Sequence, residues 1–210
     1  LFAIDRGGLV GADGATHAGA FDLSYLRCIP NMLVMAASNE NECRQMLSTG
    51  YNYNGPAAVR YPRGSGTGVE LETNLDTIEI GKAEIKRQGE NIAIFAFGSR
   101  VQAALEAGDS CNATVINMRF VKPLDSALIE QIAASHDLLI SIEENAKLGG
   151  AGSGIAEYLL SISDSTPLKI MGLPDTFLDH GDHETVLEEC GLDAKGILDT
   201  IYSFTPSIKS

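Results

Sequence analysis

Short apolar runs alternate along the chain with longer segments of helical periodicity, and this alternation sets the expected architecture. The apolar runs predict strands and the periodic segments predict helices. Strands are expected at 1–5, 32–36, 57–61, 79–86, 92–97, 113–117, 138–143 and 168–172. Helices are expected at about 17–28, 40–50, 100–107, 125–135, 152–161, 183–190 and 193–203. Strands that alternate with helices predict an α/β fold with a mostly parallel sheet.

Polar residues that favour helix N-termini precede several of these segments. Asn39 stands before the second helix, and Glu42 follows it three residues later, as in a capping box. Ser99 precedes the third helix, and Asp125 follows Pro123 at the start of the fourth. We therefore expect the side chains of Asn39, Ser99 and Asp125 to cap these helices.

A glycine-rich polar stretch between Gly64 and Asp76 divides the chain. Such a composition is typical of a linker. We read residues 1–64 as the end of one α/β domain, 65–76 as the linker and 77–210 as a second, complete domain. The first residues, Leu1 to Asp5, already form a predicted strand and include no methionine. The chain is therefore expected to be the C-terminal part of a longer protein.

The balance of acidic and basic residues also changes at about residue 64. The whole chain has 28 acidic and 15 basic residues, a net charge of −13. Residues 1–64 contain five acids, five arginines and no lysine, so the later part carries the whole excess of acid. So acidic a chain repels phosphate backbones, which argues against nucleic-acid binding. No apolar run approaches the length of a membrane span.

The segment from residue 5 to residue 19 follows a predicted strand and contains five glycines. Ligands of open α/β sheets bind beyond the carboxyl ends of the strands, and glycines let the backbone approach them closely. Arg6, Asp13 and His17 place a cation, a carboxylate and an imidazole in this one loop. An ordinary glycine-rich connection is the alternative.

A second arginine pair, Arg60 and Arg63, ends another predicted strand. Pro62 interrupts the strand between them, which directs Arg63 away from the sheet. Two solvated arginines are one interpretation of this pair. Because both strands end at the same edge of the sheet, a phosphate clamp formed by Arg6 and Arg63 is the other.

Two further segments resemble binding motifs but are expected to be structural. The run from Gly149 to Gly154 lacks the third glycine of a dinucleotide fingerprint, so we expect a tight helix entry with Ser153 as a possible cap. The cluster from Asp179 to Glu184 is too compact to surround one metal ion. Helix capping by Asp182 before His183 is the preferred interpretation.

Several longer motifs closely resemble those of the 1-deoxy-D-xylulose-5-phosphate synthases, a family of thiamine-diphosphate enzymes in the transketolase superfamily. These motifs are DRGGLVGADGATH at 5–17, GAFDLSYLR at 19–27, NECRQML at 41–47, AVRYPRG at 58–64, MRFVKPLD at 118–125, EEN at 143–145 and GLPD at 172–175. The resemblance covers essentially the whole chain. It departs from the family at Gly8, where alanine is expected.

The resemblance implies that 1–64 ends a pyrimidine-binding domain and that 77–210 is a transketolase C-terminal domain. It implies thiamine diphosphate and Mg²⁺ as cofactors, both bound mainly by an upstream part. No residue of this chain matches the family's magnesium ligands, so no metal-binding or cofactor-binding residue is expected here. The chain alone is therefore expected to be inactive.

Roles for the candidate residues follow from the same resemblance. Arg6 and Arg63 are similar to the clamp for the phosphate of glyceraldehyde 3-phosphate. Asp13 is similar to a carboxylate that contacts the substrate, and His17 to an active-site histidine that moves a proton or holds the acceptor. Pyruvate would lose CO₂ and add to the held aldehyde, which gives 1-deoxy-D-xylulose 5-phosphate, a precursor of isoprenoids, thiamine and pyridoxal.

The resemblance also implies a homodimer of the full-length protein, no nucleic-acid or membrane partner, and a location in the cytoplasm, or in the plastid of a plant or alga. Two alternatives stay open. One is a β-subunit-like piece of a 2-oxo-acid dehydrogenase, whose lipoyl acceptor has no phosphate. The other is a non-catalytic interaction module on the same fold, which would be expected to have lost Arg6, Asp13, His17 and Arg63.

Overall fold

Two sheets, four-stranded and five-stranded, organise the protein. A computed structural model describes residues 1–208. The four-stranded sheet has the order β1-β3-β2-β7 and the five-stranded sheet the order β4-β6-β5-β8-β9. The strands are β1 (Phe2–Ile4), β2 (Leu33–Ala36), β3 (Ala57–Arg60), β4 (Glu84–Arg87), β5 (Asn91–Ala96), β6 (Thr114–Asn117), β7 (Phe120–Lys122), β8 (His136–Ala146) and β9 (Leu168–Leu173).

Most strand pairs are parallel, as the alternating pattern predicts. In the first sheet β3 pairs in parallel with both β1 and β2. In the second sheet β5, β6, β8 and β9 are parallel, and β4 pairs antiparallel with β6. The predicted α/β class with a mostly parallel sheet is confirmed.

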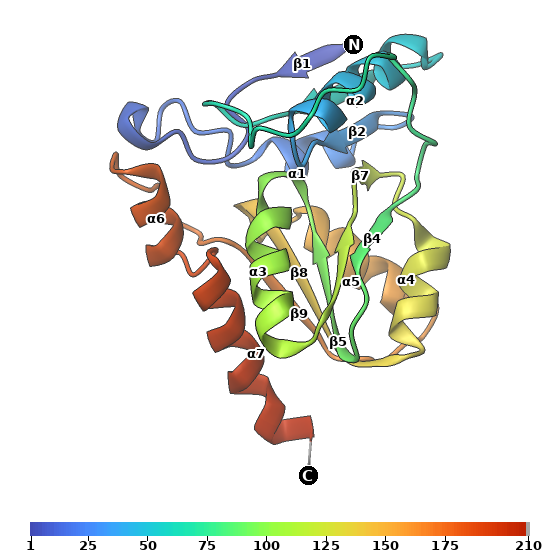
Figure 1. Ribbon diagram of the computed structural model, residues 1–210, viewed down its shortest axis with the longest axis vertical. Coiled ribbons are helices and arrows are strands. Elements are labelled where there is room, and N and C mark those ends of the chain that lie inside the picture. Colours follow the sequence, from blue (N-terminus) through green and yellow to red (C-terminus); the bar gives the residue numbers. More distant parts are fainter. Residues whose placement is uncertain (209–210) are drawn as a thin grey trace.

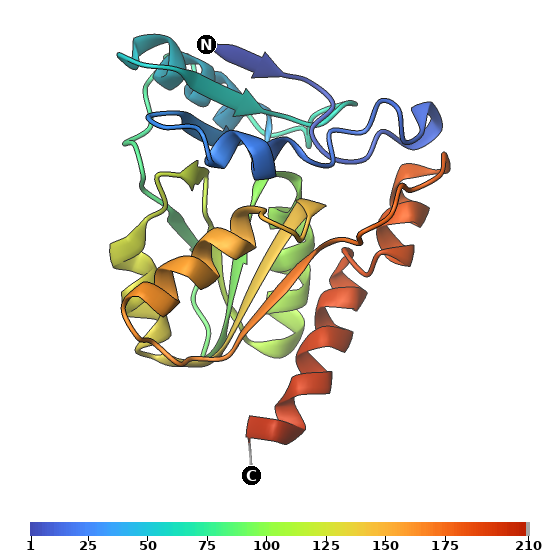
Figure 2. The same cartoon turned by 180° about the vertical axis from the view of Figure 1, so that it is seen from behind.

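The helices cover both sheets. They are α1 (Asp22–Arg27), α2 (Glu40–Asn52), α3 (Val101–Cys111), α4 (Ser126–Ala133), α5 (Ala151–Ser161), α6 (His183–Glu189) and α7 (Ala194–Ile208), with short 3₁₀ turns η1 (Gly11–Asp13) and η2 (Gly98–Arg100). Figure 1 shows the first sheet with α1 and α2 at one end of the molecule. The second sheet lies at the other end, with α3 on one face, and Figure 2 shows α5 on the opposite face. Within residues 1–208, every helix is too short or too polar to span a bilayer.

One apolar cluster joins the two sheets. It contains Val34 and Ala58 from the first sheet together with Phe95 from the second, and the side chains of all three are fully buried. Leu23 of α1 and Ile155 of α5 belong to the same cluster. Burial on this scale is the main stabilising term of a fold. The predicted boundary between residues 64 and 77 therefore separates parts that share a core, and it stays a proposal.

The strand β7 has no counterpart in the sequence-based prediction. It pairs antiparallel with β2, with Met35 opposite Phe120, so a strand of the later segment completes the earlier sheet. Three residues are too few to show a period.

Three helix starts differ from expectation. The predicted helix at 17–28 begins at Asp22, because backbone hydrogen bonds between Gly8 and Gly19 and between Gly19 and Arg6 hold the preceding residues in a loop. Ser99 does not cap α3, because its hydroxyl donates to the Glu144 carboxylate instead. Ser153 does not cap α5, which begins after Gly150.

Other expectations on the helix starts are confirmed. The side chain of Asn39 accepts a hydrogen bond from the backbone nitrogen of Glu42, 2.9 Å away. Asp125 and Asp182 cap α4 and α6 in the same manner. The predicted strand at 79–86 is shorter, because β4 begins at Glu84.

Candidate functional site

The glycine-rich loop after β1 closes on itself and on β3. Gly7 donates a backbone hydrogen bond to the carbonyl of Tyr61, 2.8 Å away. Gly19 donates to the carbonyl of Arg6 at 2.9 Å, and Gly8 donates to the carbonyl of Gly19 at 3.0 Å. Arg6 itself has a left-handed backbone, with φ of 59°. These bonds turn residues 6–19, which we call the site loop, into a closed lobe at the carboxyl edge of the first sheet.

Asp13 brings the two candidate clamp arginines together. Its Oδ2 lies 2.9 Å from Nη1 of Arg63 and 3.9 Å from Nε of Arg6. Arg6 comes from the site loop and Arg63 from the residues after β3, so the parallel strands place both at one sheet edge, as expected. Asp5 also pairs with Arg6 at 3.5 Å, so the charges of this cluster balance. One carboxylate shared by two guanidinium groups still leaves N–H donors for a further anion.

Arg6 has an unused donor at this point. Its Nε atom is buried and has no hydrogen-bond partner among the described residues. Its other contacts are to Asp5, through the backbone nitrogen at 2.7 Å and Nη1 at 3.5 Å. Buried donors without an acceptor are rare in proteins. Oδ2 of Asp13, 3.9 Å away, is beyond hydrogen-bond distance, so the Nε atom is suited to a further acceptor.

His17 lies apart from this cluster. Its ring is exposed, and Nδ1 lies 3.0 Å from the hydroxyl of Thr16. No hydrogen bond or ion pair links it to Arg6, Asp13 or Arg63 in the part of the chain that the structure describes. The structure thus brings together three of the four predicted site residues.

Arg60 is structural, unlike Arg63. Its side chain is only 3% exposed, and Nε lies 3.0 Å from the carboxylate of Asp22, which is equally buried. Its Nη2 donates to the backbone carbonyls of Gly19 at 2.9 Å and Glu144 at 2.7 Å. The interpretation of Arg60 as a solvated arginine is wrong, because the guanidinium holds the end of the site loop against the second sheet.

A large cleft opens beside Arg63, between the first sheet and the helices α3 and α6. Its volume is about 730 Å³, enough for a small-molecule ligand. Arg63, Arg44 and Arg100 contribute its cations, and Glu40, Glu106, Glu184 and Asp193 its carboxylates.

Sequence analysis did not identify this cleft, because its walls come from four separate stretches of the chain. They are 37–47, 61–67, 99–106 and 183–194.

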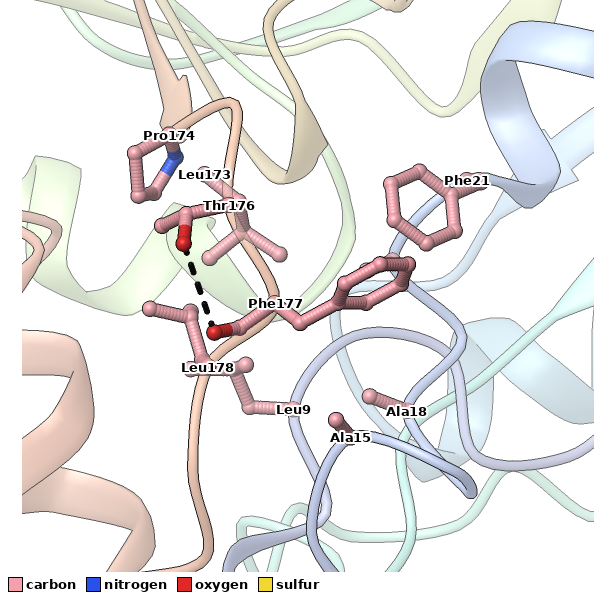
Figure 3. A pocket seen from close by; sticks show the side chains of 10 residues that line it. Leu9, Ala15, Ala18, Phe21, Leu173, Pro174, Thr176, Phe177 and Leu178 are labelled. Carbon is pink, nitrogen blue, oxygen red and sulfur yellow. Dashed lines mark hydrogen bonds between the residues drawn. The ribbon is translucent and has the colours of Figure 1, made fainter.

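A segment after β9 packs against the other side of the site loop. Phe21 and Phe177 meet edge to face, with ring centroids 6.2 Å apart and an interplanar angle of 83°. Figure 3 shows these two rings beside Leu9, Ala15 and Ala18 of the loop, around a cavity of about 20 Å³. Such a cavity has room for little more than one water molecule. We therefore interpret this contact as support for the loop.

Both motif-like segments have structural roles, although Ser153 does not cap the helix of the first. At the first one, the Glu143 carboxylate accepts hydrogen bonds from the backbone nitrogens of Ala151 and Gly152, both at 2.8 Å. A Cβ on Gly150 would lie 2.5 Å from that carboxylate, which explains the glycine.

At the second segment, Asp182 caps α6, and the His183 ring faces Glu144. Within residues 1–208 no three histidine, cysteine, aspartate or glutamate side chains gather closely enough to hold a metal ion.

The chain matches two family models. The model of the transketolase pyrimidine-binding domain matches residues 1–67, and that of the transketolase C-terminal domain matches residues 81–197. Among curated proteins, it is 62% identical over 201 residues to a 1-deoxy-D-xylulose-5-phosphate synthase of Aromatoleum aromaticum and 61% identical over 205 residues to one of Shewanella amazonensis. These matches cover 96% and 97% of this chain but 32% and 33% of the relatives. The chain spans about a third of their length.

Two solved transketolase structures also resemble this chain. A structure described as a split-gene transketolase, an inactive β4 tetramer, matches with a TM-score of 0.79 and 26% identity, over 96% of this chain and 64% of that one. A transketolase from Campylobacter jejuni matches with a TM-score of 0.73 over 96% of this chain and 31% of that one. Its identity of 18% makes it evidence for the fold alone.

Proposed function

We propose, from the premise that the chain belongs to the transketolase family, that it forms the phosphate-binding part of a 1-deoxy-D-xylulose-5-phosphate synthase. The complete enzyme would condense pyruvate with glyceraldehyde 3-phosphate and release CO₂. The observation that carries this proposal is the pair of guanidinium groups around Asp13. A 2-oxo-acid dehydrogenase, the alternative within this superfamily, has no phosphate on its lipoyl acceptor and no use for such a pair.

The aldehyde's phosphate would bind between Arg6 and Arg63. Arg6 Nε is a buried donor that awaits an acceptor, and the Arg63 side chain is half-exposed beside the cleft. Charge-assisted contacts of a guanidinium with phosphate are short and often bidentate. As the phosphate binds, the Asp13 carboxylate would give up its contact with Arg63 and turn to the polar groups of the substrate.

His17 is proposed as the residue that moves a proton or holds the acceptor. His17 is exposed, and its Nδ1 lies 3.0 Å from the Thr16 hydroxyl, which orients the ring. A histidine with one oriented nitrogen is suited to proton transfer at neutral pH.

Thiamine diphosphate would supply the electron sink for the loss of CO₂ from pyruvate. The match to a pyrimidine-binding domain supports this cofactor. The donor set for Mg²⁺ does not fit this chain, because residues 1–208 contain no cluster of suitable ligands. The metal and the diphosphate would therefore be held by the part of the enzyme that relatives have beyond this third.

We further propose that the complete enzyme is a homodimer in the cytoplasm, and that 1–64 and 77–210 are its two domains in this chain. The family models that match residues 1–67 and 81–197 support the two domains, whereas the homodimer and the location follow from the family resemblance alone. The 210-residue chain is expected to be inactive without the rest. The neighbour described as an inactive tetramer of β chains supports this expectation.

A chimera tests the proposed function. This chain would replace the matching third of the Aromatoleum aromaticum relative, and CO₂ release from pyruvate would be measured with thiamine diphosphate and Mg²⁺ present. We expect CO₂ release that depends on glyceraldehyde 3-phosphate in the chimera and none from the 210-residue chain. A folded chimera that decarboxylates pyruvate but makes no sugar phosphate would contradict the proposal.

A further inference from the structure

Glu144 connects the site loop to the second sheet. It lies near the end of β8, and its side chain is 0% exposed. Its Oε1 accepts a hydrogen bond from the backbone nitrogen of Leu9, 2.7 Å away and inside the site loop. Its Oε2 accepts one from the Ser99 hydroxyl at 2.6 Å. A residue of the C-terminal segment thus bonds directly to the loop that carries Arg6 and Asp13.

A guanidinium and an imidazole complete the surroundings of this carboxylate. Arg100 Nε lies 3.3 Å from Oε2, and His183 Nε2 lies 3.2 Å from Oε1. Burial alone would raise the pKa of the Glu144 carboxyl, but the hydrogen bond from His183, the charge of Arg100 and the bond from Ser99 together lower it to about 2. Glu144 is therefore ionised near neutral pH, and its bond to Leu9 is charge-assisted.

The backbone of the same residue fixes the other end of the loop. The Glu144 carbonyl accepts a hydrogen bond from Nη2 of Arg60, which also binds the carbonyl of Gly19. Residue 144 is thereby connected to the loop near its start, at Leu9, and near its end, at Gly19. Asp13 lies between these two points in the chain, and Arg6 precedes Leu9 by three residues, with its carbonyl bonded to Gly19.

We propose that Glu144 is a positioning residue for the clamp, whose carboxylate holds the site loop so that Arg6 and Asp13 face Arg63. The expected effect of Glu144 on substrate binding rests on the proposed function. Its expected effect on the loop does not. This role also assigns a task to the C-terminal segment, which supplies none of the four predicted site residues.

The neighbouring Glu143 provides a matched control. It is also fully buried, one residue away in the same strand. Its carboxylate binds the first backbone nitrogens of α5 and makes no hydrogen bond to the site loop among the described residues. Replacing either carboxyl group by an amide disturbs a buried, hydrogen-bonded side chain, but only the replacement of Glu144 is expected to release the loop.

Hydrogen exchange measured by mass spectrometry tests the effect on the loop in the 210-residue chain. In Glu144→Gln we expect peptides covering 7–19 to exchange about tenfold faster or more, because a charge-assisted bond to the loop is lost. In Glu143→Gln we expect faster exchange at the start of α5 and an unchanged site loop. Equal exchange of the loop in both variants would overturn the proposal.

A second variant guards against a failure to fold. Glu144→Asp keeps the charge for Arg100 and His183 but withdraws the carboxylate from Leu9 by one methylene. It should loosen the site loop and leave the far-ultraviolet circular dichroism spectrum unchanged. A loop that exchanges as slowly as in the unsubstituted chain would also overturn the proposal.

Kinetics in the chimera then test the effect on the substrate. Glu144→Gln should raise the KM for glyceraldehyde 3-phosphate about tenfold and change the KM for pyruvate little, whereas Glu143→Gln should leave both near their original values. Equal losses with both substrates would mean a general structural role. If the unsubstituted chimera folds but is inactive, the proposed function fails, and the exchange experiment still decides the role of Glu144 in the loop.

Discussion

Replacing Arg63 by alanine separates phosphate recognition from stability. The Arg63 side chain is 49% exposed, and it forms an ion pair with the Asp13 carboxylate at 2.9 Å. An exposed ion pair contributes about 0–1 kcal/mol to folding. Arg63→Ala should therefore leave the urea midpoint of the chain nearly unchanged. Any loss of substrate affinity can then be assigned to the missing guanidinium.

The expected loss of affinity follows from the contact that is removed. A hydrogen bond to a charged group contributes about 1.5–3 kcal/mol, and about 1.4 kcal/mol corresponds to a factor of ten. In the chimera, Arg63→Ala should raise the KM for glyceraldehyde 3-phosphate roughly tenfold to a hundredfold. The KM for pyruvate should change little, because pyruvate has no phosphate. Arg63→Lys should recover part of the loss, since an ammonium cannot form the paired contact.

Arg44 offers a matched control for the charge itself. It lies on the wall of the same cleft, but its Nη1 donates to the carbonyl of Glu72 at 2.6 Å, away from Asp13. Arg44→Ala removes the same charge and should leave the KM for the phosphorylated aldehyde within about twofold. Unphosphorylated glyceraldehyde is the matching substrate control, and both variants should use it as poorly as the parent. If Arg63→Ala impairs both aldehydes equally, the clamp assignment is wrong.

Three further outcomes can be measured on the 210-residue chain. Asp22→Ala should lower the free energy of unfolding by about 3–5 kcal/mol in urea titrations, because it leaves the buried Arg60 guanidinium without its carboxylate. Burial raises the pKa of the Glu143 carboxyl from 4.5 to about 7, so the folded state favours the protonated carboxyl. The stability that this protonation contributes is fully present below about pH 4.5 and is lost as pH rises through 7. Glu143→Gln should remove this part of the pH dependence, up to about 3 kcal/mol between these two pH values. Asn39→Ala removes the cap of α2 and should cost about 1 kcal/mol by the same titration.

The strands that the sequence predicts are those whose apolar residues are contiguous. The run at 92–97 is buried on both sides as β5, with helices over both faces of its sheet. The edge rule for parallel strands was enough to place Arg6 near Arg63. By contrast, β7 depends on a partner strand, β2, that lies more than eighty residues away in the chain. Local pattern contains no information on such a pairing.

Arg60 and Arg63 show why the site was predictable only in part. They are three residues apart and have the same chemistry, yet one is 3% exposed and the other 49%. The difference arises because β3 ends at Arg60, whose side chain meets Asp22 and the carbonyl of Glu144. Neither partner is near Arg60 in the sequence. Pro62 predicts where the strand ends, but the sequence does not predict which groups pack over that end.

Glu143 and Glu144 are adjacent glutamates that also differ because of the groups that pack around them. Successive side chains of a strand point to opposite faces, so the two carboxylates are directed to opposite sides of the second sheet. The Glu143 carboxylate bonds to the backbone nitrogens at the start of α5, and burial raises its pKa to about 7. The Glu144 carboxylate contacts Ser99, Arg100, His183 and Leu9, and its pKa is lowered to about 2. A shift of one residue in the strand would exchange these environments and leave the site loop without its anion. β8 pairs in parallel with β5 as far as Ile142, and its register to β9 shifts between Ile142 and Ala146. The proposed phosphate clamp therefore depends, in the C-terminal segment, on how this irregular end of β8 directs the Glu144 carboxylate.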